Sequence, residues 1–397
     1  MKVTGLSIMN RRGQHRVFGL VGFGMRLSGA EPSVVLSFEA ADKAQSLALE
    51  EMVDGRLGSD REIHRFSLVT HLLPNGPCVL KVRAADGRVL AAYDLLVDNQ
   101  GPLAAAVASQ LIAQRTRFVL GAEIDASIWP YESGELIAWF DSNGVAEPSV
   151  TRERPSLEPL TDIAQSVAHM RDFGFTVLPE TVPEEWCDEL NRMFDQGVAS
   201  GEINYTWGSS QRILGLHRSS AGRRIWTYAP VIQFLRQWFR DEPVACQTLY
   251  YCFGSQQRAH QDTIHLTPYP AGYMCGVWVA LQDVEQGSGE LFVIPGSHKL
   301  RRIRGNELEL DKVNEDYSAY AKFDNEIANM VSVTRLETVP YRPKKGTILV
   351  WHENLIHGGE PRANKELPRR SIVSHYFAKG AIAYYDSRGE PAALEEI

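Results

Sequence analysis

The order of secondary-structure signals in the C-terminal half most constrains the fold of this chain. Ile163, Val167 and Met170 follow the i, i+4, i+7 spacing of one helix face, and Pro183 opens a second apolar helix. After residue 246 short β-branched or aromatic segments dominate, at residues 247–253, 276–281, 291–294, 347–351 and 370–377. Helices followed by antiparallel strands predict an α+β, mainly β domain whose sheets form a jelly roll with flanking helices.

The N-terminal 100 residues show a different pattern of short strands separated by turns. Residues 34–40 are apolar and β-branched, and residues 78–84 and 89–97 flank Asp86-Gly87, a hairpin-turn signal. Several strands without intervening helices predict a small β-sandwich.

Between these two regions lie a helix signal and a proline-containing connection. Residues 104–116 are rich in alanine, and three prolines stand among charged residues near 145–159. We therefore expect a β-sandwich accessory domain over 1–100, a helix and linker over 101–160, and the jelly-roll domain over 161–397.

Composition excludes several functional classes. A formal net charge of -8 argues against a general nucleic-acid binder, which would carry a basic face. No apolar run approaches the roughly 20 residues that span a bilayer, so we expect no membrane association. The five cysteines are odd in number and show no C-x-x-C spacing, which indicates neither a disulfide framework nor a zinc site. We expect a protein of the reducing cytoplasm; a homodimer is left open.

The motif with the most chemical content is His260-Gln261-Asp262. On an extended segment, residues two apart point the same way, so the imidazole and the carboxylate can bind one ion. His357, 97 residues further on, is the best candidate for a third ligand from a distant strand. Two histidines and one carboxylate leave coordination positions open, as in non-haem Fe(II) oxygenases. By itself an H-x-D motif is weak, because a hydrogen-bonded histidine and a turn-capping aspartate look the same.

Other segments strengthen that interpretation. From about Asp162 to Phe377 the chain resembles the phytanoyl-CoA dioxygenase family of Fe(II)- and 2-oxoglutarate-dependent oxygenases. The order and spacing of the matching segments carry this resemblance: 172–178 (DFGFTVL), 260–262 (HQD), 278–283 (WVALQD), 287–291 (GSGEL), 295–299 (PGSHK), 345–347 (KGT) and 351–358 (WHENLIHG).

The resemblance implies a fold, cofactors and further site residues. The fold is a cupin-like double-stranded β-helix, and Fe(II), 2-oxoglutarate and O2 are the cofactor and co-substrates. Family members bind the distal carboxylate of 2-oxoglutarate with an arginine about a dozen residues past the second histidine, and Arg369 in the pattern Arg-x-x-Ile-x-x-His matches that place better than Arg370. A guanidinium suits this task because it binds a carboxylate with two hydrogen bonds and keeps its charge. Gln261 and Trp278 match positions that line the same pocket.

The predicted function is hydroxylation of an unactivated C–H bond in a small, carrier-linked or sugar-linked metabolite, with release of succinate and CO2. Asp262 favours hydroxylation over halogenation, because related halogenases replace this carboxylate with a small residue. Desaturation, epoxidation and rearrangement need the same ligands and stay open. Alternatives of another class are a non-catalytic binding or scaffold protein on the same fold and a cupin-like hydrolase or isomerase with another metal.

Overall fold

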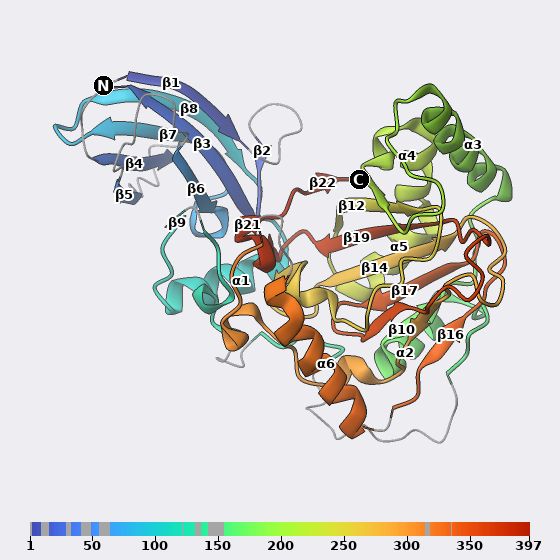
Figure 1. The fold of residues 1–397 in the computed structure, drawn as a ribbon. Coiled ribbons are helices and arrows are strands. Elements are labelled where there is room, and N and C mark those ends of the chain that lie inside the picture. Colours follow the sequence, from blue (N-terminus) through green and yellow to red (C-terminus); the bar gives the residue numbers. More distant parts are fainter. Residues whose placement is uncertain are drawn as a thin grey trace. The chain divides into compact units, whose positions relative to one another are not determined.

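The chain folds into two compact units. Figure 1 shows the computed structural model, which describes residues 2–8, 16–28, 33–40, 49–54, 64–121, 123–131, 136–141, 155–313, 318–334 and 336–397. The first unit contains Met1–Leu136, Thr267–Pro270 and Lys379–Glu395; the second contains Ile137–Leu266, Ala271–Ala378 and Glu396–Ile397. The two units divide the chain at other positions than residues 100 and 160, where the sequence predicts domain boundaries. The predicted boundaries stay a prediction. Most of the expected linker at 145–159 lies outside the described residues.

Two sheets make up most of the first unit. One has four strands in the order β1 (Lys2–Ile8), β3 (Leu20–Ser28), β6 (His64–Val69) and β9 (Val119–Leu120). The other has five, in the order β2 (Arg16–Val17), β8 (Val89–Val97), β7 (Gly76–Ala84), β4 (Ser33–Ala40) and β5 (Leu49–Asp54). One hydrophobic core takes side chains from both sheets, among them Phe23 and Phe66 from the first and Phe38 and Leu80 from the second. The predicted strands at 34–40, 78–84 and 89–97 are confirmed.

A second core of the first unit joins segments that are distant in sequence. Helix α1 (Pro102–Ala113) begins with a proline, whose missing N–H costs nothing at that position. A small sheet contains β13 (Thr267–Tyr269), β20 (Ile382–Tyr385) and β21 (Glu390–Pro391). Trp129 packs on Tyr269 and Tyr384, with ring centroids 5.9 Å apart in both pairs.

A large antiparallel sheet forms the centre of the second unit. Six of its strands lie in the order β10 (Phe175–Val177), β17 (Ile348–His352), β14 (Met274–Ala280), β19 (Ser371–Ala378), β12 (Pro243–Tyr251) and β11 (Arg212–Leu214). A smaller sheet has the order β16 (Val339–Tyr341), β15 (Leu291–Val293) and β18 (His357–Gly359). Side chains of both sheets share one core, for example Leu349 and Val373 with Leu291 and Val293. This shared core defines the inner face of the large sheet.

Helices cover the outer face of the large sheet. They are α2 (Ile163–Phe173), α3 (Glu184–Ser200), α4 (Ser220–Trp226) and α5 (Ala229–Phe239). Tyr250 of β12 donates to Asn191 Oδ1 of α3 at 3.0 Å, and Tyr376 of β19 donates to the Trp226 carbonyl of α4 at 2.7 Å. Alternate residues of these two strands therefore face the helices, and the residues between them face the shared core.

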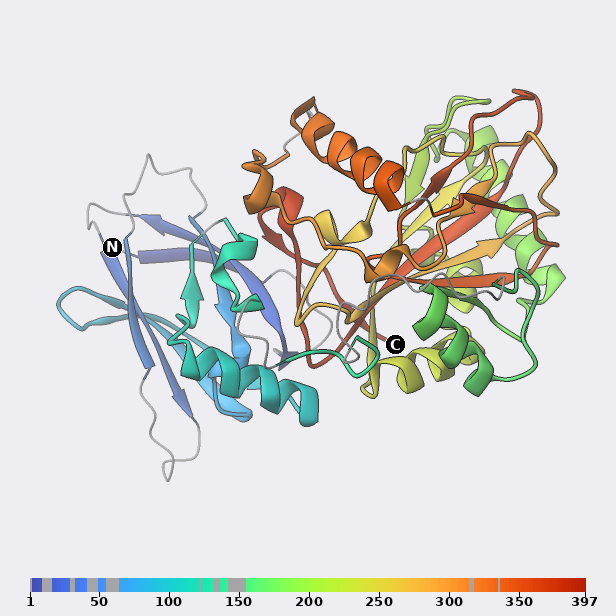
Figure 2. The same cartoon turned by 90° about the horizontal axis from the view of Figure 1, so that it is seen from below.

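The helix ends follow from local chemistry. Asp162 caps α2 by accepting from the Gln165 N–H, and Gly174 ends the helix in the left-handed conformation. Phe173 is consequently the last residue of α2, and strand β10 follows at Phe175–Val177. Helix α6 (Ala321–Thr334) lies on another side-chain cluster, where its Phe323 and Ile327 pack with Phe292 of β15 and its neighbours. Figure 2 shows α6, in orange, apart from the green helices α2 and α3.

All five cysteines are buried, and none of them forms a disulfide bond. No helix in the described part of the chain has the length and hydropathy needed to cross a bilayer.

Candidate metal centre

The H-x-D segment and the segment that carries His357 are joined by backbone hydrogen bonds. The His260 N–H donates to the His357 carbonyl at 3.0 Å, and the His357 N–H donates to the His260 carbonyl at 3.1 Å. The Asp262 N–H donates to the carbonyl of Glu353 at 3.1 Å. These bonds bring two segments about a hundred residues apart into one register, with Asp262 at the start of a short 3-10 helix.

Both histidines are set to offer the same nitrogen to a metal. His260 Nδ1 lies 2.8 Å from the Arg258 carbonyl, and His357 Nδ1 lies 3.0 Å from the Leu355 carbonyl. A carbonyl only accepts, so each Nδ1 carries the ring proton and each Nε2 keeps its lone pair. This arrangement is typical of metal-binding histidines, in which a hydrogen bond from the other ring nitrogen fixes tautomer and orientation.

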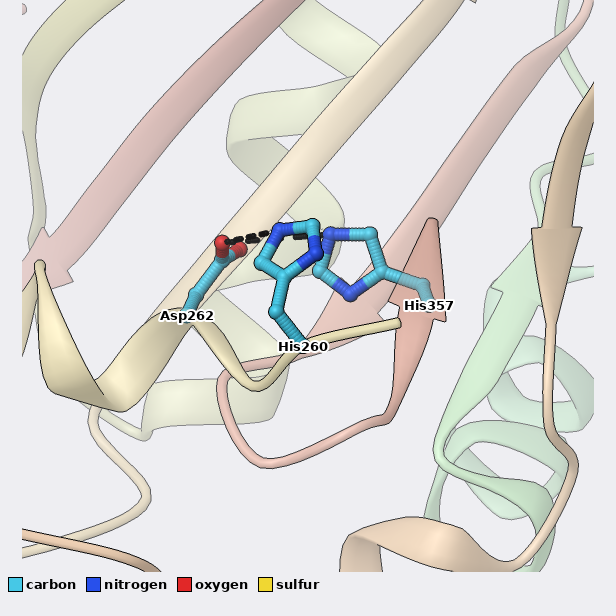
Figure 3. A group of neighbouring side chains, drawn as sticks. All are labelled: His260, Asp262 and His357. Carbon is cyan, nitrogen blue, oxygen red and sulfur yellow. Dashed lines mark ion pairs between the residues drawn. The ribbon is translucent and has the colours of Figure 1, made fainter. Parts of the chain in front are cut away.

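The three predicted ligands converge on one point, as Figure 3 shows. Asp262 Oδ1 lies 3.5 Å from His260 Nε2 and 3.8 Å from His357 Nε2, and one ligand atom from each residue fits within 4.8 Å of the others. Metal–ligand bonds of about 2.0–2.2 Å place neighbouring ligand atoms about 3 Å apart. The three side chains can therefore bind one metal ion if the distances between their ligand atoms shorten slightly.

The electrostatics of the three residues suit a cation. Burial lowers the pKa of His357 to about 4, so its imidazole is neutral at neutral pH and available as a ligand. Burial by itself would raise the pKa of Asp262, but the facing His357, with His260 and His375, holds this pKa well below its usual range. The site thus combines the ionised carboxylate of Asp262 with the neutral imidazole of His357.

Arg369 and Arg370 lie in opposite environments. Arg370 forms two hydrogen bonds with Asp195 of α3, at 2.9 and 2.8 Å. Arg369 is 2% exposed and lies over the rings of Trp278 and Tyr251, with its Cζ 5.7 and 6.0 Å from their centroids. Among the described residues no carboxylate pairs with Arg369, and its Nε has no hydrogen-bond partner. Glu290, the acidic group that acts on it electrostatically, is itself paired with Arg342 at 2.8 Å.

The two other predicted pocket residues differ in what they contact. Trp278 is buried on β14 beside Arg369, and its Nε1 has no hydrogen-bond partner in the described part of the chain. The amide of Gln261 is used by the protein itself: it donates to the Arg301 carbonyl at 3.0 Å and accepts from the Ile303 N–H at 3.2 Å. Its role toward the co-substrate stays a prediction, whereas its bonds to the backbone of residues 301 and 303 are visible.

Several other histidines lie outside this centre. His217 Nδ1 contacts Thr248 Oγ1 at 2.8 Å and its ring packs on Trp226, which places it on the outer face of the large sheet. His298 is buried and donates to the Arg171 carbonyl at 3.0 Å. His352 is also buried and packs against Phe140 and Trp238.

Three residues near the centre were not identified from the sequence. His375 Nε2 lies 3.6 Å from Asp262 Oδ2, Trp351 Nε1 donates to the same oxygen at 2.7 Å, and the Gln257 amide nitrogen lies 3.1 Å from His260 Nε2. His375 ends the Arg-x-x-Ile-x-x-His pattern that singled out Arg369, so its alternation with Arg369 along one strand was the available signal. Trp351 begins the family-like segment 351–358, but nothing in that segment indicates its contact with Asp262, and Gln257 has no sequence signal.

Sequence comparison places this geometry in a known family. The family model described as phytanoyl-CoA dioxygenase (PhyH) matches residues 170–371, half of the chain. Phytanoyl-CoA dioxygenase domain-containing protein 1 of Danio rerio is 31% identical over 222 residues, which are 53% of this chain and 72% of that protein. The Mus musculus protein of the same name is 27% identical over 204 residues, 49% of this chain and 68% of that protein. The chain therefore belongs to the phytanoyl-CoA dioxygenase family, which confirms the predicted class of iron- and 2-oxoglutarate-dependent dioxygenase.

Solved structures also show similarity over more than half of the chain. One is the epimerase SnoN in complex with Fe3+, alpha ketoglutarate and nogalamycin RO, with 20% identity and a TM-score of 0.42 over 56% of this chain and 85% of that one. Another is the carbocyclase SnoK from nogalamycin biosynthesis, with 18% identity and a TM-score of 0.45 over 59% and 96%. The family assignment rests on the sequence matches.

Proposed function

We propose that this chain is an Fe(II)- and 2-oxoglutarate-dependent hydroxylase of a small, carrier-linked or sugar-linked metabolite. The observation that carries the proposal is the convergence of the His260–Asp262–His357 donor set, together with the buried guanidinium of Arg369, which pairs with no carboxylate among the described residues. A buried cation without a counter-charge is costly, so this position calls for an anionic ligand. A dicarboxylate such as 2-oxoglutarate satisfies the metal and the arginine at once.

Each residue then has a defined task. His260, Asp262 and His357 would hold Fe(II), and Arg369 would bind the distal carboxylate of 2-oxoglutarate, with Trp278 packed against the guanidinium. Iron with 2-oxoglutarate supplies the oxidant: one oxygen atom of O2 enters succinate as CO2 leaves, and the other enters the substrate C–H bond as a hydroxyl. The protein's part is to orient the co-substrate and to keep water away from the reacting groups. On this proposal the two sheets of the second unit are the double-stranded β-helix, and those of the first unit are the accessory β-sandwich.

Anaerobic titration with Fe(II) and 2-oxoglutarate tests this proposal directly. The expected result is a visible charge-transfer band for the wild-type protein, lost in Asp262→Ala and retained in Asp283→Ala, whose carboxylate is on the surface. Substrate screening would follow succinate release and a product mass increase of one oxygen. Absence of the band, with only weak metal binding, would favour the non-catalytic binding protein.

A further inference from the structure

Three residues form a row across adjacent strands beneath Asp262. Gly276 of β14 pairs directly with Trp351 of β17 on one side and with His375 of β19 on the other. Directly opposite residues in a sheet point to the same face, so the two rings stand on either side of a residue that has no side chain.

The glycine makes room for the indole ring. A Cβ atom at Gly276 would lie 2.2 Å from Trp351 Cε2 and 2.5 Å from its Nε1, distances that no real side chain could adopt. The indole of Trp351 therefore lies across the middle strand, in the place where a side chain would stand, and meets the ring of His375 edge-on with centroids 6.3 Å apart. From this position its N–H reaches Asp262.

Trp351 and His375 both face the Oδ2 atom of Asp262. Trp351 Nε1 donates to Oδ2 at 2.7 Å, and an indole N–H can act only as a donor. His375 Nε2 lies 3.6 Å from Oδ2, while its Nδ1 lies 3.4 Å from the amide nitrogen of Gln247. Because that amide nitrogen donates to Nδ1, the ring proton of His375 belongs on Nε2, facing the carboxylate.

The two oxygens of Asp262 are thereby assigned different partners. Oδ2 faces two donors on the inner face of the large sheet, and Oδ1 faces the Nε2 atoms of His260 and His357. All of these side chains are buried.

We propose that Trp351 and His375 are positioning residues that make Asp262 a one-oxygen metal ligand, with Gly276 as the space that admits the indole. This inference rests on the proposed function and adds the geometry of its carboxylate ligand. A carboxylate that binds through both oxygens would occupy one of the coordination positions needed for the co-substrates. Holding Oδ2 away from the metal keeps that position open.

The variant Trp351→Phe tests the proposal, because it keeps an aromatic ring and removes the N–H. Co(II), which is stable in air, serves as the probe, with affinity measured by calorimetry and ligand geometry by its visible d–d spectrum. The expected result is about 10–100-fold weaker Co(II) binding, the range for loss of a group that orients a metal ligand, and an altered spectrum. Trp226→Phe, a fully buried indole on the outer face, is the matched control and should leave both readouts unchanged.

A second pair of variants covers the case in which Trp351→Phe fails to fold. His375→Leu should weaken Co(II) binding and change the spectrum, and His375→Gln, which keeps a donor, should restore part of both. If the folded variants bind Co(II) within twofold of wild type with an unchanged spectrum, the positioning role is wrong although the metal centre stands. If the wild-type protein itself binds no metal, the proposed function fails, and this inference fails with it.

Discussion

The guanidinium groups of Arg369 and Arg370 lie on opposite faces of the large sheet. Arg370 reaches Asp195 of α3 on the outer, helix-covered face, whereas Arg369 lies over Trp278 and Tyr251 on the inner face. Alternation of side chains along a strand explains why neighbours in sequence have separate environments. Burial lowers the pKa of Arg369 to about 10, so the group is still charged at neutral pH.

Arg369→Ala is therefore expected to raise the dissociation constant for 2-oxoglutarate by at least about a hundredfold, since a charge-assisted pair of hydrogen bonds is lost. The Fe(II)–2-oxoglutarate charge-transfer band, titrated anaerobically, gives this constant. Arg370→Ala is the matched control and should change it by less than about twofold. Equal effects of the two substitutions would assign the co-substrate site elsewhere.

Gly358 lies where the two segments that carry the candidate metal ligands meet. A Cβ there would lie 2.5 Å from the ring of Phe292 and 2.8 Å from the Gln257 carbonyl. We expect Gly358→Ala to cost about 1–3 kcal/mol in free energy of unfolding and to weaken Co(II) binding, because the segments before His260 and after His357 must separate. Gly121→Ala, with nothing within 4 Å of its added Cβ, should leave both quantities near wild type. Denaturant unfolding and calorimetry measure the two; unchanged metal affinity in Gly358→Ala would mean that the segments tolerate the separation.

Arg302 pairs with the carboxylates of Glu353 and Asp141 next to the candidate metal centre. Its guanidinium donates to Glu353 at 3.0 Å and to Asp141 at 2.7 Å, and Glu353, fully buried, also accepts from the Gly272 N–H at 2.7 Å. Arg302→Met should lower the free energy of unfolding by about 3–5 kcal/mol, because it leaves a buried carboxylate without its partner.

The exposed pair Arg236–Glu242 provides the control for this measurement. Arg236→Met removes a surface ion pair and should cost less than about 1 kcal/mol. Urea unfolding of both variants gives the comparison. Similar losses in the two would show that Arg302 contributes no more than a surface charge.

The burial of His71 predicts that the stability of the first unit depends on pH. Its Nε2 lies 2.8 Å from the Gly380 carbonyl, its Nδ1 has no partner among the described residues, and burial lowers its pKa to about 4. The unfolded chain, with a histidine pKa of about 6.5, binds the proton more readily, so stability is lost as the pH falls from 6.5 toward 4. Between pH 7 and pH 5 the loss amounts to about 2 kcal/mol.

Replacement by glutamine checks this assignment, since His71→Gln keeps a donor for Gly380 but does not titrate. Thermal unfolding at pH 7 and pH 5 should show a smaller decrease for the variant than for the wild-type protein. Parallel decreases in the two proteins would assign the acid sensitivity to other groups.

The basic cluster at Lys299, Arg301, Arg302 and Arg304 shows how far charge patterns alone can be read. The sequence pattern of this cluster is typical of a solvated charged face, and it also occurs in anion-binding patches. In the structure Arg301 pairs with Glu307 and Glu326, Arg304 pairs with Glu307, and Arg302 is turned inward to Glu353. The acidic partners of Arg302 lie 51 residues away at Glu353 and 161 residues away at Asp141, so spacing in the sequence could not reveal them.

The sequence by itself determined the residues whose chemistry is encoded in short motifs. His260 and Asp262 stand two residues apart, His357 lies in a family segment, and strand alternation separated Arg369 from Arg370. Only the tertiary structure decided what surrounds them. The row Trp351–Gly276–His375 exists because three strands pair in one register, and register is set by core packing across the whole sheet and not by any local pattern.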